Sequence, residues 1–171
     1  MGQSYASPPP GPGNPAVIRS VGRCILLLVF SFGLWSFAWM YHTAKEVSSR
    51  VRQPPPSPGV RAALYVIPIV NYVMWFFSWQ EIEDYCKRTR SQDFPLVLFF
   101  VLTLLIPFAA LFTMPIVQSR MNDAHRAATN GAATNAPMET IDWVFLILGI
   151  LFFVLYIIII IAVIAAAATS N

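Results

Sequence analysis

The chain has 171 residues, of which 57% are hydrophobic and 11% are charged, and its formal net charge is +3. Soluble domains contain about 25% charged and about 45–50% apolar residues. The mean hydropathy of +0.61 departs from a soluble domain in the same direction. This composition argues against a soluble enzyme and predicts a membrane protein.

Residues 1–16 are rich in proline and glycine. Such a composition cannot bury enough apolar surface to fold, so we expect a disordered tail there. A docking site for a proline-binding partner stays open as an alternative. The prolines of this tail are Pro8, Pro9, Pro10, Pro12 and Pro15.

Four stretches without a charged residue follow, at 24–41, 62–80, 94–118 and 143–171. Crossing a hydrocarbon core about 30 Å thick takes about 20 helical residues. We therefore expect an all-α integral membrane protein with four transmembrane helices. Residues 17–126 would form a membrane domain of three spans, at about 24–41, 62–80 and 95–117. A polar loop at 127–142 would lead to the fourth span at 143–168.

The four stretches differ in strength. The fourth is the most apolar, since it is built largely of Ile, Leu, Phe and Val. The second is the weakest, because Pro68 and Asn71 lie inside it and Tyr and Trp make up much of its apolar content. A re-entrant or tilted path therefore stays open for the second stretch. Pro107 and Pro115 predict a local kink in the third.

Two tryptophan pairs end the first two stretches with one helical turn between their members. Trp35 and Trp39 form the first pair, and Trp75 and Trp79 form the second. Because Trp prefers the depth of the lipid headgroups, we expect an interfacial aromatic belt. A shared aromatic surface for a lipid or a partner is the alternative.

Charged residues four apart suggest that the helices continue into water beyond the spans. Glu83 with Lys87 and Asp84 with Arg88 follow this spacing, which favours ion pairs on one helix face. Glu81 lies in the same acidic group. A metal or proton role for this group would need further ligands, so we expect solvated side chains there.

The positive-inside rule does not orient the four predicted spans. Five Lys and Arg residues would lie on the side of both termini and six on the other side. The first set is Arg19, Arg23, Lys87, Arg88 and Arg90, and the second is Lys45, Arg50, Arg52, Arg61, Arg120 and Arg126.

Catalytic constellations are missing from the sequence. His42 and His125 lie in different predicted loops, and no HExxH, GxSxG, Walker or dinucleotide motif occurs. We therefore predict no enzyme activity, no catalytic, cofactor-binding or metal-ligating residues, and no cofactor. The predicted spans also contain no Asp, Glu, Lys, Arg or His, which argues against a proton-coupled transporter.

Cys24 and Cys86 are the only cysteines. The predicted topology puts both on the same side of the membrane, so a disulfide is conceivable. Unclustered cysteines are more often small apolar core residues.

Three short motifs resemble a bacterial membrane family catalogued as domain of unknown function 4234. They are Phe32-Gly33-Leu34-Trp35 with Trp39-Met40-Tyr41, then Ile67-Pro68-Ile69-Val70-Asn71-Tyr72, and finally Val117-Gln118-Ser119-Arg120-Met121-Asn122. The resemblance covers residues 17–126. It implies a membrane architecture, whereas the family has no established activity, substrate or cofactor to carry over. Some relatives carry a zinc-ribbon-like segment ahead of the first span, which implies cytoplasmic termini.

The expected protein is a small multi-pass protein of the bacterial plasma membrane with both termini in the cytoplasm. It would be non-catalytic and would act through helix packing or through recruited membrane-protein partners, in contact with the lipid bilayer and not with nucleic acid. The oligomeric state stays open. The alternative function is a small oligomeric channel or uncoupled transporter, with Asn71, Thr103 and Thr113 lining the pore.

Overall fold

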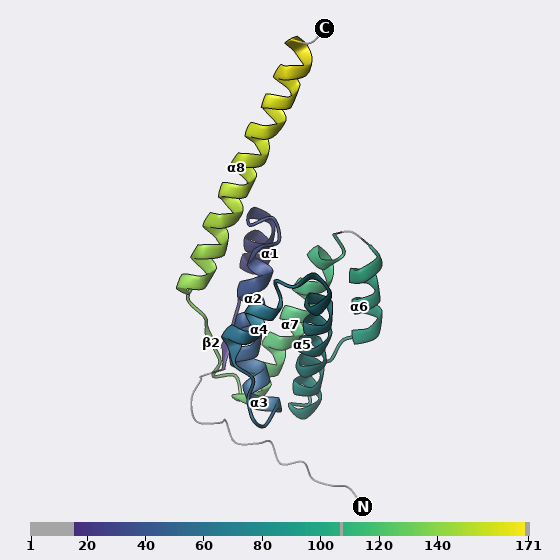
Figure 1. Ribbon diagram of the computed structural model, residues 1–171. Helices are drawn as coiled ribbons and strands as arrows, with labels where there is room; N and C mark the ends of the chain where they lie inside the picture. Colours follow the sequence, from purple (N-terminus) through teal and green to yellow (C-terminus); the bar gives the residue numbers. More distant parts are fainter. Residues whose placement is uncertain (1–15, 107, 170–171) are drawn as a thin grey trace, which may run out of the picture.

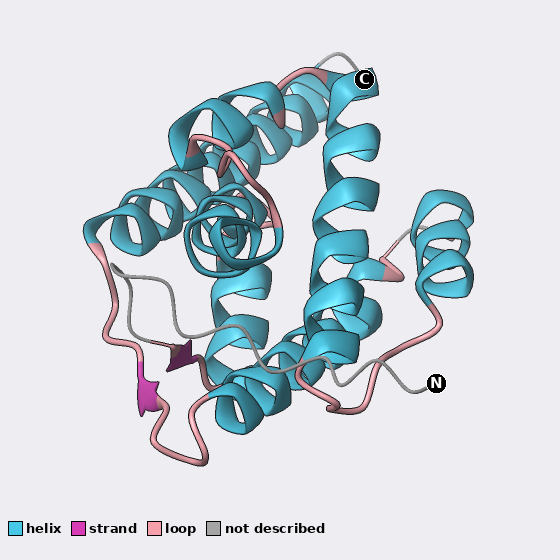
Figure 2. Ribbon diagram, turned by 90° about the horizontal axis from the view of Figure 1, so that it is seen from below, coloured by secondary structure: helices cyan, strands magenta, loops and turns pink. Residues whose placement is uncertain are grey.

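The computed structural model describes residues 16–106 and 108–169, and this part of the chain is mostly helical. The predicted all-α class is confirmed. Apart from Ala16, the predicted proline-rich tail lies outside the described residues, as does Pro107. Two short strands, β1 (Val17–Ile18) and β2 (Thr134–Asn135), pair in parallel. Figure 2 shows them side by side at the edge of an otherwise helical molecule.

The first apolar stretch forms two helices and not one. α1 (Val21–Phe30) ends in a turn, and α2 (Trp35–Thr43) leads back along it. Gly33 has a φ of +83°, a backbone conformation that residues with a side chain rarely adopt. Phe32 also has a positive φ, of 52°. The Ser31 hydroxyl accepts a hydrogen bond of 2.8 Å from the backbone N–H of Trp35 and so closes the turn.

The second stretch also bends. α2 continues through the π-helix η1 (Ala44–Ser48) into α3 (Ser49–Val51), and a proline-rich loop leads to α4 (Pro58–Leu64). The chain then turns at 65–67 before α5 (Pro68–Arg88) begins. Pro68 suits this position, because the first turn of a helix needs no N–H from it.

The third stretch is divided between α6 (Leu96–Leu105) and α7 (Ala110–Ala128). Phe108 lies in the turn with a φ of 67°. Pro115 is accommodated inside α7. α7 leads to β2 and then to α8 (Thr140–Thr169).

The three turns lie at the end of the bundle toward which α8 projects, whereas α3 lies at the opposite end (Figure 1). Within residues 16–106 and 108–169, one helix is long and apolar enough to cross a membrane, at 140–168. The structure therefore does not support four spans. The physical reason is that the first three stretches each bend back on themselves.

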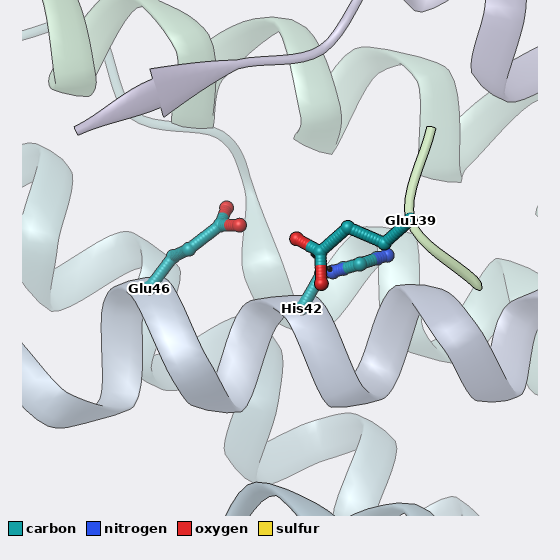
Figure 3. A group of neighbouring side chains, drawn as sticks. All are labelled: His42, Glu46 and Glu139. Atoms are coloured by element: carbon teal, nitrogen blue, oxygen red, sulfur yellow. Dashed lines mark ion pairs between the residues drawn. The ribbon is translucent and has the colours of Figure 1, made fainter. Parts of the chain in front are cut away.

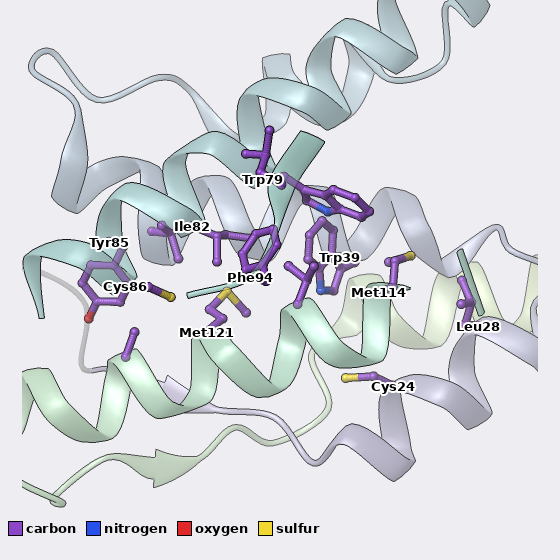
Figure 4. Close-up of a cluster of buried hydrophobic side chains, with 14 of the residues drawn as sticks. Cys24, Leu28, Trp39, Trp79, Ile82, Tyr85, Cys86, Phe94, Met114 and Met121 are labelled. Atoms are coloured by element: carbon purple, nitrogen blue, oxygen red, sulfur yellow. The ribbon is translucent and has the colours of Figure 1, made fainter. Parts of the chain in front are cut away.

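The core consists mainly of aromatic, aliphatic and sulfur-containing side chains from α1, α2, α5 and α7, and Val47, Phe94 and Leu96 complete it (Figure 4). Trp35, Trp39 and Trp79 are at most 2% exposed. The predicted interfacial belt is therefore wrong for these three residues. Trp35 and Trp39 instead donate buried hydrogen bonds to Asp142 (2.7 Å) and Gln118 (2.8 Å).

Candidate functional site

The residues that flank each of the first three apolar stretches meet in space. Arg61 and Glu81 flank the second stretch, and two hydrogen bonds of 2.6 Å join their side chains. They are 20 residues apart in the chain. One straight helix would hold their backbones about 30 Å apart. The stretch between them is therefore a hairpin with both ends at one level.

The other two stretches are closed in the same way. Arg19 and Glu46 flank the first stretch and form an ion pair of 2.5 Å. Gln92 and Arg120 flank the third, and the guanidinium of Arg120 donates a hydrogen bond to the amide oxygen of Gln92. All three hairpins are thus tied at their bases by polar side chains.

Glu81 is the centre of one buried polar group. Its carboxylate accepts hydrogen bonds from Arg61 and from the Ser48 hydroxyl, and it pairs with Arg52. Glu81 is 2% exposed and Arg61 is 6% exposed. The expectation of a solvated Glu81 was wrong, because its partners come from segments remote in sequence. Glu83 does pair with Lys87, at 2.9 Å, as its spacing predicted.

A second buried polar group joins the segment just ahead of α1, together with α2 and η1, to the start of α8. Burial by itself would lower the pKa of Arg19, but the hydrogen bond and the charge of Glu46 raise it above its usual value. Glu139 lies 3.8 Å from the same guanidinium and accepts from the Lys45 ammonium at 3.2 Å. Asp142 belongs to this group as well.

His42 is held in one orientation within this second group. Its Nε2 lies 3.0 Å from the Asp142 carboxylate, which can only accept, so Nε2 donates this hydrogen bond. Asp142 is itself fixed by the Trp35 indole and by the backbone N–H of Glu139 at 2.9 Å. The other ring nitrogen, Nδ1, has no hydrogen-bond partner within the described part of the chain. It lies 3.7 Å from a carboxylate oxygen of Glu139.

His42, Glu46 and Glu139 offer three ligand atoms that lie within 4.8 Å of one another. Figure 3 shows His42 and Glu46 projecting from one face of the helix towards Glu139. The sequence analysis assigned no role to this set, since Glu139 comes from a remote segment. The available signal was the spacing of His42 and Glu46, which puts two ligand types on one helix face.

The second histidine, His125, is fully buried and lies 3.2 Å from the Tyr85 hydroxyl. Burial lowers the pKa of His125 to about 3, and the positive charges of Arg50 and Arg19 add to this effect. His125 is therefore neutral at physiological pH. His125 contacts Tyr85, whereas His42 contacts Asp142 and Glu139, so the two histidines belong to different groups.

Large apolar side chains are exposed at the three turns. Ile69, Phe108 and Phe112 are each more than 70% exposed, and Phe32 is 59% exposed. Contact of these apolar side chains with water would cost free energy, whereas contact with lipid would not. The exposed apolar residues at the turns are Phe30, Phe32, Val66, Ile67, Ile69, Leu105, Ile106, Phe108 and Phe112.

Two of the three residues proposed to line a pore, and both cysteines, take part in packing within the molecule. Thr103 and Thr113 join their hydroxyls across the α6–α7 hairpin at 2.9 Å, which is the packing role expected of such residues in helices. Cys24 and Cys86 are both buried and free, so no disulfide links them. Burial raises the pKa of the Cys86 thiol to about 11.

Comparison of the chain with protein-family models, with curated proteins and with solved structures gave no match. The resemblance to domain of unknown function 4234 therefore stays a prediction.

Proposed function

We propose that this chain is a non-catalytic integral membrane protein in which α8 crosses the bilayer and the three hairpins enter it from one side and return. The ion pair between Arg61 and Glu81 carries this proposal. Two charged groups that are 2.6 Å apart belong on one side of a membrane. The closures by Arg19 with Glu46 and by Arg120 with Gln92 support the same topology.

The lengths of the helices fit this insertion. α1 and α6 have 10 residues each and are about 15 Å long, which is half of a hydrocarbon core. The ring of Phe32, at the first turn, stacks on Phe153 of α8 at 4.8 Å. Phe153 comes ten residues after Trp143, or about 15 Å along α8. With Trp143 at the interface, the first hairpin would end near the middle of the bilayer.

The charges support one orientation for this topology. All 11 Lys and Arg residues of the sequence precede α8. With hairpins that return, these residues share one side of the membrane, and the nearly even division between two sides that four spans would give no longer applies. The positive-inside rule then assigns the helical bundle to the cytoplasm of a plasma membrane.

The four-span arrangement remains the competing topology, with three charged loops on alternating sides. The two topologies differ most sharply for residues near 92. Four spans would separate them from residues near 53 and 130 by the full bilayer, whereas hairpins hold all three on one face.

The test is labelling of single cysteines with a membrane-impermeant maleimide in inverted and right-side-out vesicles. Cys24→Ala and Cys86→Ala supply the background, and Gln53→Cys, Gln92→Cys and Asn130→Cys report exposed positions. We expect all three to react from the cytoplasmic side, with Ala168→Cys reacting from the opposite side. Reaction of Gln92→Cys from the side opposite to the other two loops would establish four spans instead.

The role that fits this architecture is helix packing in the membrane and recruitment of partners. The buried charged side chains pair with one another through the described ion pairs and hydrogen bonds. Their burial therefore does not require a catalytic role. Crosslinking in intact membranes, followed by identification of the captured proteins, tests this role. Capture of defined membrane proteins is expected to be lost when the exposed loops are changed. Substrate turnover that disappears in Glu81→Gln would overturn it.

A further inference from the structure

We propose that His42, Glu46 and Glu139 bind one divalent transition-metal ion, of the kind represented by Zn²⁺ and Mn²⁺. This ion would connect α2 and η1 to the segment just ahead of α8. The proposal is independent of the membrane topology, since it depends only on contacts within the second buried polar group.

The strongest observation is the orphaned nitrogen of His42. The side chain is 1% exposed, and its Nδ1 has no hydrogen-bond partner among the described residues. A buried polar atom without a hydrogen-bond partner is costly. Since Nε2 is engaged by Asp142, Nδ1 is the ring nitrogen left to bind an ion, and it lies 3.7 Å from a carboxylate oxygen of Glu139. A cation between these two atoms would satisfy both.

The surroundings of His42 are those of a metal-binding histidine. Such a histidine usually donates its other ring N–H to a carboxylate, which fixes the tautomer and strengthens the ligand. Asp142 is the carboxylate that accepts this hydrogen bond from His42. The Trp35 indole and the backbone N–H of Glu139 hold Asp142 in place. This arrangement orients His42 before any ion binds.

The distances suit a small ion. Ligand atoms at 2.0–2.2 Å from Zn²⁺ lie about 3–3.5 Å apart. The three candidate atoms lie within 4.8 Å of one another and need only a small approach. One imidazole nitrogen and two carboxylate oxygens favour Zn²⁺ or Mn²⁺ over Ca²⁺, which takes oxygen ligands.

The charge balance also admits a cation. Glu46, Glu139 and Asp142 contribute three negative charges, against the two positive charges of Arg19 and Lys45. The Lys45 side chain is about one third exposed, and its ammonium contacts Glu139. If a divalent ion displaced this ammonium toward water, the remaining group would be neutral. Lys45 and the ion would thus compete for Glu139.

The test is metal binding to the tag-free full chain in detergent, measured by elemental analysis after equilibration with Zn²⁺ or Mn²⁺ and by the absorption bands of Co²⁺. We expect about one ion per chain. Glu139→Gln and His42→Gln should each weaken binding at least tenfold, whereas Glu83→Gln, a carboxylate paired with Lys87 outside the cluster, should not change it.

Lys45→Gln separates the metal site from a plain ion-pair network. It removes the competitor for Glu139 and keeps all three ligands, so the metal should bind several-fold more tightly. Glu139 is partly exposed, so Glu139→Gln should still fold and keep the comparison valid. No bound ion at 100-fold excess of metal, or equal binding in wild type and Glu139→Gln, would overturn the proposal.

Discussion

The guanidinium of Arg61 and the carboxylate of Glu81 form a paired hydrogen-bonded contact, with both N–O distances at 2.6 Å. These two residues are the charged neighbours of the second apolar stretch, at its beginning and its end. Their contact turns a stretch that is long enough to cross a bilayer into a hairpin. Each hairpin therefore has polar side chains paired at its base and exposed apolar side chains at its turn.

Removing the Glu81 charge should destabilise the bundle. Glu81→Gln leaves Arg61 buried without its counter-charge, at a cost of about 3 kcal/mol. Thermal unfolding in detergent measures this change. Glu83→Gln is the control, because its ion pair with Lys87 is at the surface, and it should leave the midpoint almost unchanged. Equal effects of the two changes would contradict the buried role of Glu81.

Stability should fall in acid through His125. The unfolded chain binds a proton at this histidine below about pH 6.5, whereas the folded chain does so only near pH 3. Stability is therefore lost as the pH decreases through this window, by an amount on the order of 4 kcal/mol. His125→Gln can still bond to the Tyr85 hydroxyl and should flatten the profile of unfolding midpoint against pH between 7 and 4. If the unfolding midpoint of His125→Gln fell with pH as steeply as that of the wild type, His125 would not be the cause of the loss of stability in acid.

A side chain at position 149 should separate α8 from the first hairpin. A Cβ added to Gly149 would lie 2.6 Å from the carbonyl carbon and oxygen of Ser31, so backbone would have to move. We expect Gly149→Val to reduce disulfide formation between Phe32→Cys and Phe153→Cys, whose native rings stack. Gly59→Val, with open space around it, should leave the crosslink intact. An unchanged crosslink in both would show that α8 does not need this contact.

The three turns should report lipid and not water. A bimane label at Phe32→Cys, Ile69→Cys or Phe108→Cys should emit at short wavelength and be quenched by brominated lipid in reconstituted vesicles. A label at Asn130→Cys should emit as in water, since it lies in the polar turn after α7. Water-like emission at all four positions would mean that the turns stay outside the bilayer.

The helical class could be predicted from the sequence, and so could α8, because a long unbroken apolar stretch is recognised from local sequence alone. The bends were only partly visible. Pro68 and Asn71 raised a re-entrant path for the second stretch, but Gly33 was not recognised as a turn residue. The tryptophans were assigned to an interface because Trp prefers that depth, although the structure buries Trp35 and Trp39 against Asp142 and Gln118.

The candidate metal site was out of reach for a different reason. Two of its ligands, His42 and Glu46, share a helix face, but Glu139 follows them by more than ninety residues. Nothing in local spacing reports that the chain returns to the same point. The same holds for the orphaned Nδ1 of His42, which depends on Asp142 holding the opposite nitrogen.

By itself the sequence determined that this chain is helical and rich in apolar residues, and that its charged residues lie outside its long apolar stretches. Those properties follow from composition and local order. Tertiary structure alone decided which charges meet, and hence that three of the four stretches form hairpins. An apolar stretch of about 20 residues is compatible with both a span and a hairpin, and only the contact between its flanking residues, such as Arg61 with Glu81, distinguishes the two.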